Sequence, residues 1–321
     1  AYWYTRKPPK NMKPRHNVQI MLCSIECCIT HPLDDPAIRK NRTFCADLEG
    51  WGRISNNIFI WDYNTNFFAY DMPCPNLRTI SRNLRFFQRN NVHGVFMQAN
   101  GNGNAGEMSD LRNYVMLRCL WNPELDDGAL VEEFCRLHYR EAAGTMLEYL
   151  EYIHDIAQNS GFEPGCFGTK AEFGITREVA MKAHDYFTKA IEEAGDPAVR
   201  QRVEKASICA YRALLDTATE LRFDNGNAYL ASPPPYEDLF DRYVELCGRH
   251  NMTHAAEWVP LGVFLEETRR LMAGVPANRI EIENWRFTNI AMPAQRIVEG
   301  LHKPSKRHLR ISWPGYSIMN P

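Results

Sequence analysis

Three stretches of the chain share one pattern, in which a run of apolar residues ends abruptly in polar side chains. They read NVQIMLCSIE over residues 17–26, IFIWDYNTN over residues 58–66 and VFMQANGNGN over residues 95–104. Runs of this length that are rich in aliphatic and aromatic residues are typical of buried strands. We therefore expect three strands, each with polar groups at the point where it stops.

Helical periodicity fills the intervals between these strands. From residue 76 to residue 90 the apolar residues recur every three or four positions, as on one helix face: Leu77, Ile80, Leu84 and Phe87. The spacing resumes at Leu111 and Val115 and stops near Pro123, and a weaker helix is expected within residues 36–50. Strands that alternate with helices predict a parallel sheet, because each helix returns the chain to the same edge.

The alternation predicts an α/β fold, the C-terminal part of a (β/α)8 TIM-type barrel. A complete barrel needs roughly 250 residues, whereas this alternation ends near residue 124. Residues 2–5 are expected to form one more strand end, and the opening at Ala1, without a Met, is what we expect of a piece of a longer protein. The carboxyl ends of barrel strands converge on one face, so the polar groups at the three strand ends are expected to meet in one pocket.

The rest of the chain, residues 125–321, predicts an α-helical domain with an irregular tail. Helices are expected over residues 127–159, 176–194 and 236–250, and from Asp196 and Pro197, which are a good N-cap and first-turn pair. Segments rich in Gly, Pro and Ser separate them at residues 159–168 and 225–235, and residues 281–286 are a candidate strand. The predicted domains are therefore 1–124, a partial barrel with the site, and 125–321.

Composition removes several classes of partner. The net charge of −2 gives no electrostatic reason to expect nucleic acid, and no apolar run is long enough to span a bilayer. We therefore expect no nucleic-acid partner and no membrane insertion.

The ten cysteines give no framework of disulfides and no metal centre. Cys23, Cys27, Cys28 and His31 resemble a metal cluster, but Cys23 and Cys27 fall on one strand face and Cys28 on the other, so they do not converge as tetrahedral ligands must. We expect buried thiols, no metal and no cofactor.

Two carboxylates at strand ends are the candidate catalytic residues. Glu26 ends the first strand, and the alternative is that it pairs with Arg42 or Lys40 to close a loop. Asp62 alternates with Asn64 and follows Ile58 and Ile60 on the same side of the second strand, which we interpret as the barrel interior. A buried aspartate there must be paired, hydrogen-bonded or functional.

Aromatic and amide side chains near the same ends are candidate sugar contacts, because an aromatic ring stacks on the apolar face of a pyranose. Trp51 lies between two glycines and is expected to be exposed, Tyr63 is expected either to pack beneath helices or to contact sugar, and Trp61 is expected in the core. The full set of candidate binding residues is Tyr4, Trp51, Tyr63, Asn64, Gln98, Asn100 and Glu107. For the glycine-rich loop at 100–107 the alternative is a turn that caps the next helix.

Several segments together resemble a known family. They are residues 2–10 (YWYTRKPPK), 60–67 (IWDYNTNF) and 73–76 (PCPN), with Gly106-Glu107, residues 111–114 (LRNY) and residues 120–123 (LWNP). They look like bacterial proteins that carry an uncharacterised domain of the glycosidase TIM-barrel clan, which includes endo-β-N-acetylglucosaminidases and is similar in layout to β-hexosaminidases and α-glucuronidases. The resemblance covers residues 1 to about 155.

The resemblance implies a retaining glycoside hydrolase that cleaves a glycan with a β-linked N-acetylhexosamine and uses the acetamido group of the substrate as nucleophile. It also implies a secreted or periplasmic location. An acidic motif that family members carry upstream of the segment at residues 2–5 is absent, which leaves the general acid unassigned. The alternative function is a non-catalytic carbohydrate-binding or scaffold module derived from such a barrel.

Overall fold

The computed structural model describes residues 5–218, 220–231 and 236–276. Its first part is a three-stranded sheet of β1 (Ile20–Cys23), β2 (Ile58–Tyr63) and β3 (Val92–Gln98), in that order and all parallel. Leu22, Ile60 and Val95 lie side by side in the register. The three predicted strands and their parallel pairing are confirmed.

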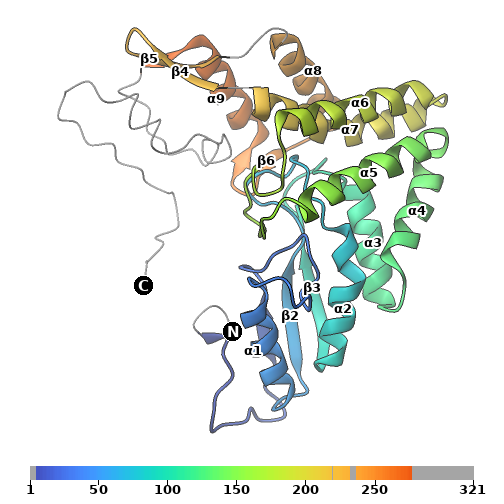
Figure 1. Ribbon diagram of the computed structural model, residues 1–321, viewed down its shortest axis with the longest axis vertical. Helices are drawn as coiled ribbons and strands as arrows, with labels where there is room; N and C mark the ends of the chain where they lie inside the picture. The colour runs from blue at the N-terminus through green and yellow to red at the C-terminus, as the bar shows by residue number, and fades with distance from the viewer. Residues whose placement is uncertain (1–4, 219, 232–235, 277–321) are drawn as a thin grey trace.

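Helices connect and follow these strands (Figure 1). They are α1 (Arg42–Gly52), α2 (Ile80–Arg89), which a 3-10 turn at Leu77–Thr79 precedes, and α3 (Ser109–Trp121). The helix expected within residues 76–90 is confirmed, and its predicted apolar face is buried. The weaker helix begins at Arg42, later than the sequence indicated, because Pro36 and the residues after it form turns.

The two faces of the sheet have different surroundings. Leu22, Ile58 and Ile60 are completely buried in one core with apolar residues of α1 and α2, among them Phe44 and Leu84. The opposite face is partly open: Met21 is 38% exposed and Phe96 is 47% exposed. Within the described residues, the helices therefore cover one face only.

The sequence interpretation assigned these two faces the wrong way round. It placed Ile58, Ile60 and Asp62 towards a barrel interior and Trp61 beneath the helices, whereas the aliphatic positions pack against the helices. Trp61 and Tyr63 belong to a separate aromatic cluster on the open face. The alternation itself is correct, and strand periodicity alone does not say which face the helices will cover.

Four helices continue the first core beyond residue 124. They are α4 (Asp127–His138), α5 (Ala143–Gln158), α6 (Arg177–Glu193) and α7 (Pro197–Ala218). This core runs without a break from Leu22 to Ala213, so it crosses the domain boundary expected at residue 124. Residues 127–159 are helical as expected and form two helices, because Arg140 has a positive φ of 44° in the connecting turn.

A second core forms where α8 (Tyr236–Arg249) and α9 (Leu261–Ala273) pack on the last turns of α7. The predicted starts of α6, α7 and α8 are confirmed to within one residue. Thr176 caps α6 through its side chain, which accepts a hydrogen bond from the amide of Val179.

Short strands interrupt the region that the sequence predicted to be helical. β4 (Glu220–Asp224) and β5 (Asn227–Ala231) form a hairpin, and β8 (Val275–Pro276) pairs with β5. Asn225 and Gly226 both have positive φ, as a two-residue hairpin turn requires, so the Asn-Gly pair was a signal that the sequence interpretation treated only as a break. β6 (His254–Ala256) and β7 (Val259–Pro260) form a second hairpin. The strand expected at residues 281–286 lies outside the described residues.

Buried charges join the loop after β2 to the second core. Arg212 on α7 donates to Asp71 at 2.8 Å and to Asp216 at 3.0 Å, and Tyr243 on α8 donates to Asp71 at 2.6 Å. The side chains of Arg212 and Asp71 have no exposed area. Two backbone hydrogen bonds hold the hairpin β6–β7 against the same loop: the amide of Tyr70 donates to the carbonyl of Ala255 at 2.9 Å, and the amide of Glu257 donates to the carbonyl of Phe67 at 3.0 Å.

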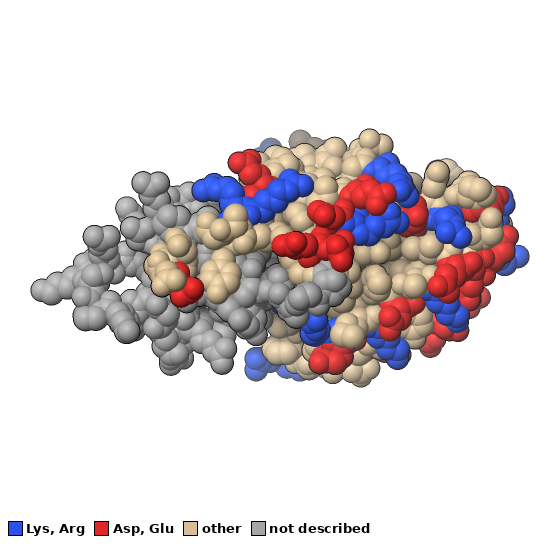
Figure 2. Space-filling model, turned by 90° about the horizontal axis from the view of Figure 1, so that it is seen from above, with Lys and Arg blue, Asp and Glu red and all other residues tan. Residues whose placement is uncertain are grey.

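The described helices include none that is long and apolar enough to cross a membrane. On the face seen in Figure 2, acidic and basic side chains are interspersed.

Candidate functional site

The carboxyl edge of the sheet carries two cavities that meet. The smaller, about 340 Å³, lies against the open face of the sheet; we call it the aromatic cleft. The larger, about 920 Å³, lies between the loop after β3, the start of α3 and the end of α8; we call it the polar groove. Gln98, Glu257 and Trp258 line both, so the two cavities are adjacent and share this part of their walls.

Rings form the walls of the aromatic cleft. Trp61 and Tyr63 lie nearly parallel, with ring centroids 6.3 Å apart, although they are neighbours on one face of β2. Phe167 and Trp258 stack on the other side, with centroids 6.4 Å apart and an interplanar angle of 7°. Trp258 is 57% exposed, which leaves its ring accessible to a ligand.

A carboxyl group and an amide occupy the point where the cavities join. Gln98 accepts a hydrogen bond from the indole of Trp61 at 2.7 Å and donates to Glu257 at 3.4 Å. Partial burial raises the pKa of the Glu257 carboxyl, and the hydrogen bond from Gln98 opposes part of that effect. A carboxyl group whose pKa is raised holds its proton to a higher pH than a solvated one, which favours a role in proton transfer.

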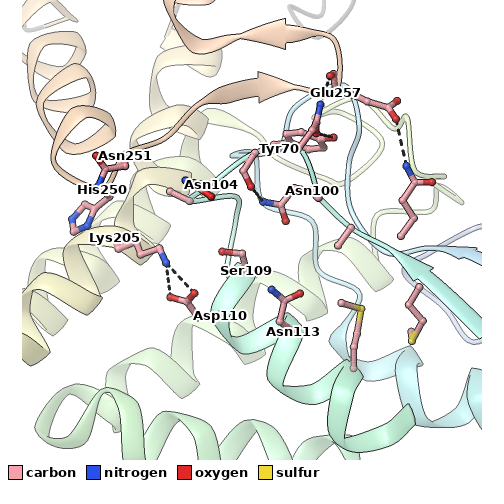
Figure 3. A pocket seen from close by; sticks show the side chains of 18 of the residues that line it. Tyr70, Asn100, Asn104, Ser109, Asp110, Asn113, Lys205, His250, Asn251 and Glu257 are labelled. Carbon is pink, nitrogen blue, oxygen red and sulfur yellow. Dashed lines mark hydrogen bonds and ion pairs between the residues drawn. The ribbon is translucent and has the colours of Figure 1, made fainter. Parts of the chain in front are cut away.

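The polar groove is lined by hydroxyl, amide and charged side chains (Figure 3). Ser109, Asp110 and Asn113 come from the start of α3, Lys205 comes from α7, and His250 and Asn251 come from the turn that follows α8. Asn100 and Asn104 come from the loop after β3, where Asn100 closes a turn by donating to the carbonyl of Gly103 at 3.0 Å. The groove therefore offers many hydrogen-bonding groups and few rings.

Glu26 is placed at the same edge but has a protein partner. It forms an ion pair with Arg6, which is 3% exposed and also donates to Asp47 at 3.0 Å. Neither Arg42 nor Lys40, the partners considered from the sequence, makes this contact. The second carboxylate oxygen of Glu26 is buried and has no hydrogen-bond partner among the described residues.

Asp62 is buried on the covered face of the sheet and lines neither cavity. It accepts hydrogen bonds from Ser24 at 2.6 Å and from Asn64 at 3.0 Å. Burial raises the pKa of its carboxyl group, and the two hydrogen bonds oppose that rise. These contacts connect the ends of β1 and β2, which is a structural role.

Of the predicted binding residues, the structure brings three to the cavities. Tyr63 lines the aromatic cleft, Asn100 lines the polar groove and Gln98 lines both. Asn64 is engaged with Asp62. Tyr4 lies outside the described residues.

Trp51 and Glu107 have structural surroundings instead. Trp51 belongs to α1 rather than to a turn, is 7% exposed, and donates through its indole to the carbonyl of Arg6; it is therefore no exposed platform. Glu107 is buried in an ion pair with Arg112, whose guanidinium also donates to the carbonyl of Cys74 at 2.9 Å. Glu107 thus stabilises the start of α3 and does not line either cavity.

Sequence reasoning missed the residues that come from beyond residue 155. Phe167 lies in a segment read only as a break, and Glu257 and Trp258 form the tip of the hairpin β6–β7. The sequence carries no local signal for this pair, because its exposure and the turn that holds it are known only from the structure. Its place above the sheet depends on the packing of α8 and α9, which no local pattern reveals.

The comparisons with known proteins concern only the first part of the chain. Residues 1–151 match the model of a family described as a domain of unknown function (DUF4838). No curated protein and no solved structure matches the chain. Phe167, Glu257 and Trp258 lie beyond the matched residues.

Proposed function

We propose that this chain is the carbohydrate-binding part of a glycoside hydrolase whose substrate is a glycan with a β-linked N-acetylhexosamine. One observation carries the proposal: the aromatic cleft places stacked rings, an amide and a carboxyl group together at the carboxyl edge of a parallel sheet. Rings stack on the apolar faces of sugars, and amide and carboxyl groups bind their hydroxyls.

The fold that we propose for the complete site is a (β/α)8 barrel, of which β1–β3 are the C-terminal part. The open face of the sheet supports this proposal, because parallel sheets are normally covered on both faces. Within the described residues no strand pairs with the outer edge of β1 or of β3. In a barrel these edges continue into further strands, and the open face with Trp61 and Phe96 becomes the interior.

Glu257 is the described carboxyl group best placed to act on a sugar in the cleft. Retaining hydrolysis with acetamido assistance requires a proton donor and a second group that orients the acetamido group. A raised pKa suits Glu257 to the first role. The second role would fall to a carboxylate from the remainder of the barrel.

A second candidate function is a binding or scaffold module without catalysis. It is favoured by the engagement of Glu26, Asp62 and Glu107 with protein partners. The two candidates make the same prediction for binding and different predictions for hydrolysis.

Replacing Trp61 by alanine is expected to weaken the binding of chitotriose, a trimer of β-linked N-acetylglucosamine, at least tenfold, because the stacking surface is lost. Isothermal titration calorimetry on this chain measures the affinity. Trp121→Ala is the matched control, since Trp121 is 93% exposed on α3 and lines neither cavity. Equal affinities for the two variants would contradict the proposal.

Hydrolysis separates the two candidate functions. Release of 4-nitrophenol from its N-acetyl-β-glucosaminide, abolished by Glu257→Gln with chitotriose binding retained, would support catalysis with Glu257 as the acid. Binding of chitotriose without release, both by this chain and by any longer protein that contains it, would support the module.

A further inference from the structure

The polar groove holds one pair of opposite charges at the end away from the aromatic cleft. Lys205 donates to both carboxylate oxygens of Asp110, at 2.9 and 2.7 Å, and the two side chains point towards each other across the groove (Figure 3). The side chains are 30% and 43% exposed, so both remain accessible to a ligand. The pair presents donors and acceptors but almost no net charge.

Uncommitted amide groups surround this pair. The side chains of Asn104, Asn113 and Asn251 line the groove, are exposed, and have no hydrogen bond from their amides within the described chain. Each amide offers one acceptor oxygen and two donor hydrogens. A ligand rich in hydroxyl groups uses both kinds, since every hydroxyl donates and accepts.

The remaining titratable groups of the groove do not favour an anion. Burial lowers the pKa of His250, so its imidazole is neutral at pH 7. Glu257 adds a carboxyl group at the junction with the aromatic cleft. With Lys205 neutralised by Asp110, the groove has no unpaired cation among its described lining residues.

We infer that the polar groove binds an uncharged sugar unit next to the unit in the aromatic cleft, and that Asp110 excludes acidic sugars by keeping Lys205 paired. The inference rests on the proposed carbohydrate-binding function and adds the chemical class of the second unit. The inference is carried by the adjacency of the two cavities, because an oligosaccharide that passes over the shared residues Gln98, Glu257 and Trp258 would place one unit in each.

Removing the negative charge of Asp110 tests the inference directly. Asp110→Asn leaves Lys205 without a carboxylate partner and so creates a site for the carboxylate of a sugar. Calorimetry with this chain compares two probes, neutral chitotriose and a hyaluronan tetrasaccharide, in which N-acetylglucosamine alternates with glucuronate. The wild-type chain is expected to bind chitotriose at least tenfold more tightly than the hyaluronan tetrasaccharide. In Asp110→Asn the ratio of these two affinities is expected to shift about tenfold in favour of hyaluronan.

Two further variants complete the design. Asp155→Asn is the matched control, because Asp155 forms an exposed ion pair with Arg78 at 2.6 Å outside the groove and its replacement changes the net charge equally. Asn113→Ala alters no charge and is expected to weaken chitotriose binding several-fold without changing the preference. Circular dichroism melting confirms that each variant is folded.

The outcomes separate this inference from the proposed function. If Trp61→Ala abolishes chitotriose binding while Asp110→Asn and Asn113→Ala change nothing, the aromatic cleft binds sugar and the polar groove does not. If Asp110→Asn and Asp155→Asn shift the ratio of the two affinities equally, the shift is an effect of net charge alone and the inference is overturned. Absence of binding to either probe would remove the proposed function and the inference together.

Discussion

Replacing Arg212 by methionine is expected to lower the free energy of unfolding by about 4 kcal/mol, because a buried ion pair that loses one partner leaves an uncompensated charge. Asp71 is completely buried and would keep only the hydroxyl of Tyr243 as a side-chain hydrogen-bond donor. Asp216, 7% exposed, would lose the same partner. Urea unfolding followed by circular dichroism measures the change.

Arg140→Met is the control for this experiment. Arg140 pairs with Asp196 at 3.1 Å, but the two side chains are 54% and 40% exposed, so solvent already screens their interaction. Its replacement is expected to cost less than about 1 kcal/mol. A loss of similar size in both variants would contradict the view that burial makes the Arg212 cluster important.

Acidification is expected to destabilise the protein strongly through His154. Burial lowers the pKa of this imidazole to about 3. Its Nε2 accepts a hydrogen bond from the amide of Leu77 at 3.1 Å, and its Nδ1 lies 2.7 Å from the carbonyl of Leu150. The neutral ring with its proton on Nδ1 makes both hydrogen bonds. A second proton would go to Nε2 and would remove the hydrogen bond from the amide of Leu77.

The sign follows from the difference between the folded and unfolded states. The unfolded chain takes up the proton near pH 6.5 and the folded chain only near pH 3, so the stabilisation is complete above pH 6.5 and is lost as the pH falls towards 3. At pH 4.5 the loss from this group is about 2.5 kcal/mol. Urea unfolding at a series of pH values measures it.

A glutamine at position 154 provides the test, because its amide can accept and donate but does not titrate. His154→Gln is expected to be less stable than the wild type at pH 7 and to lose less stability between pH 7 and pH 4.5. His93→Gln, at an exposed position of β3, is the control. Parallel pH profiles for wild type and His154→Gln would show that another group governs the acid sensitivity.

The sequence indicated the edge of the sheet where the candidate site lies and only some of the residues that line it. Of the candidates, Tyr63, Gln98 and Asn100 reach the cavities because they follow directly from strand ends that the apolar pattern located. Asp62 and Glu107 do not, since a polar residue beside a buried strand can as well satisfy its neighbours as face a ligand. Only the positions of Ser24 and Arg112 decide between these roles.

The sequence by itself determined the parallel strands, the helices between and after them, and the cap of α7 at Asp196, because periodicity and caps act over a few neighbouring residues. The tertiary structure alone decided which face of the sheet is covered, since that choice depends on how α1 and α2 fill the space over Leu22, Ile58 and Ile60. It also decided that Glu257 meets Gln98, across about 160 residues of chain, and that Trp258 lines the same cavities. Such contacts arise from the packing of whole helices. The free energy that stabilises them comes from many residues of the core and not from the residues of the site alone.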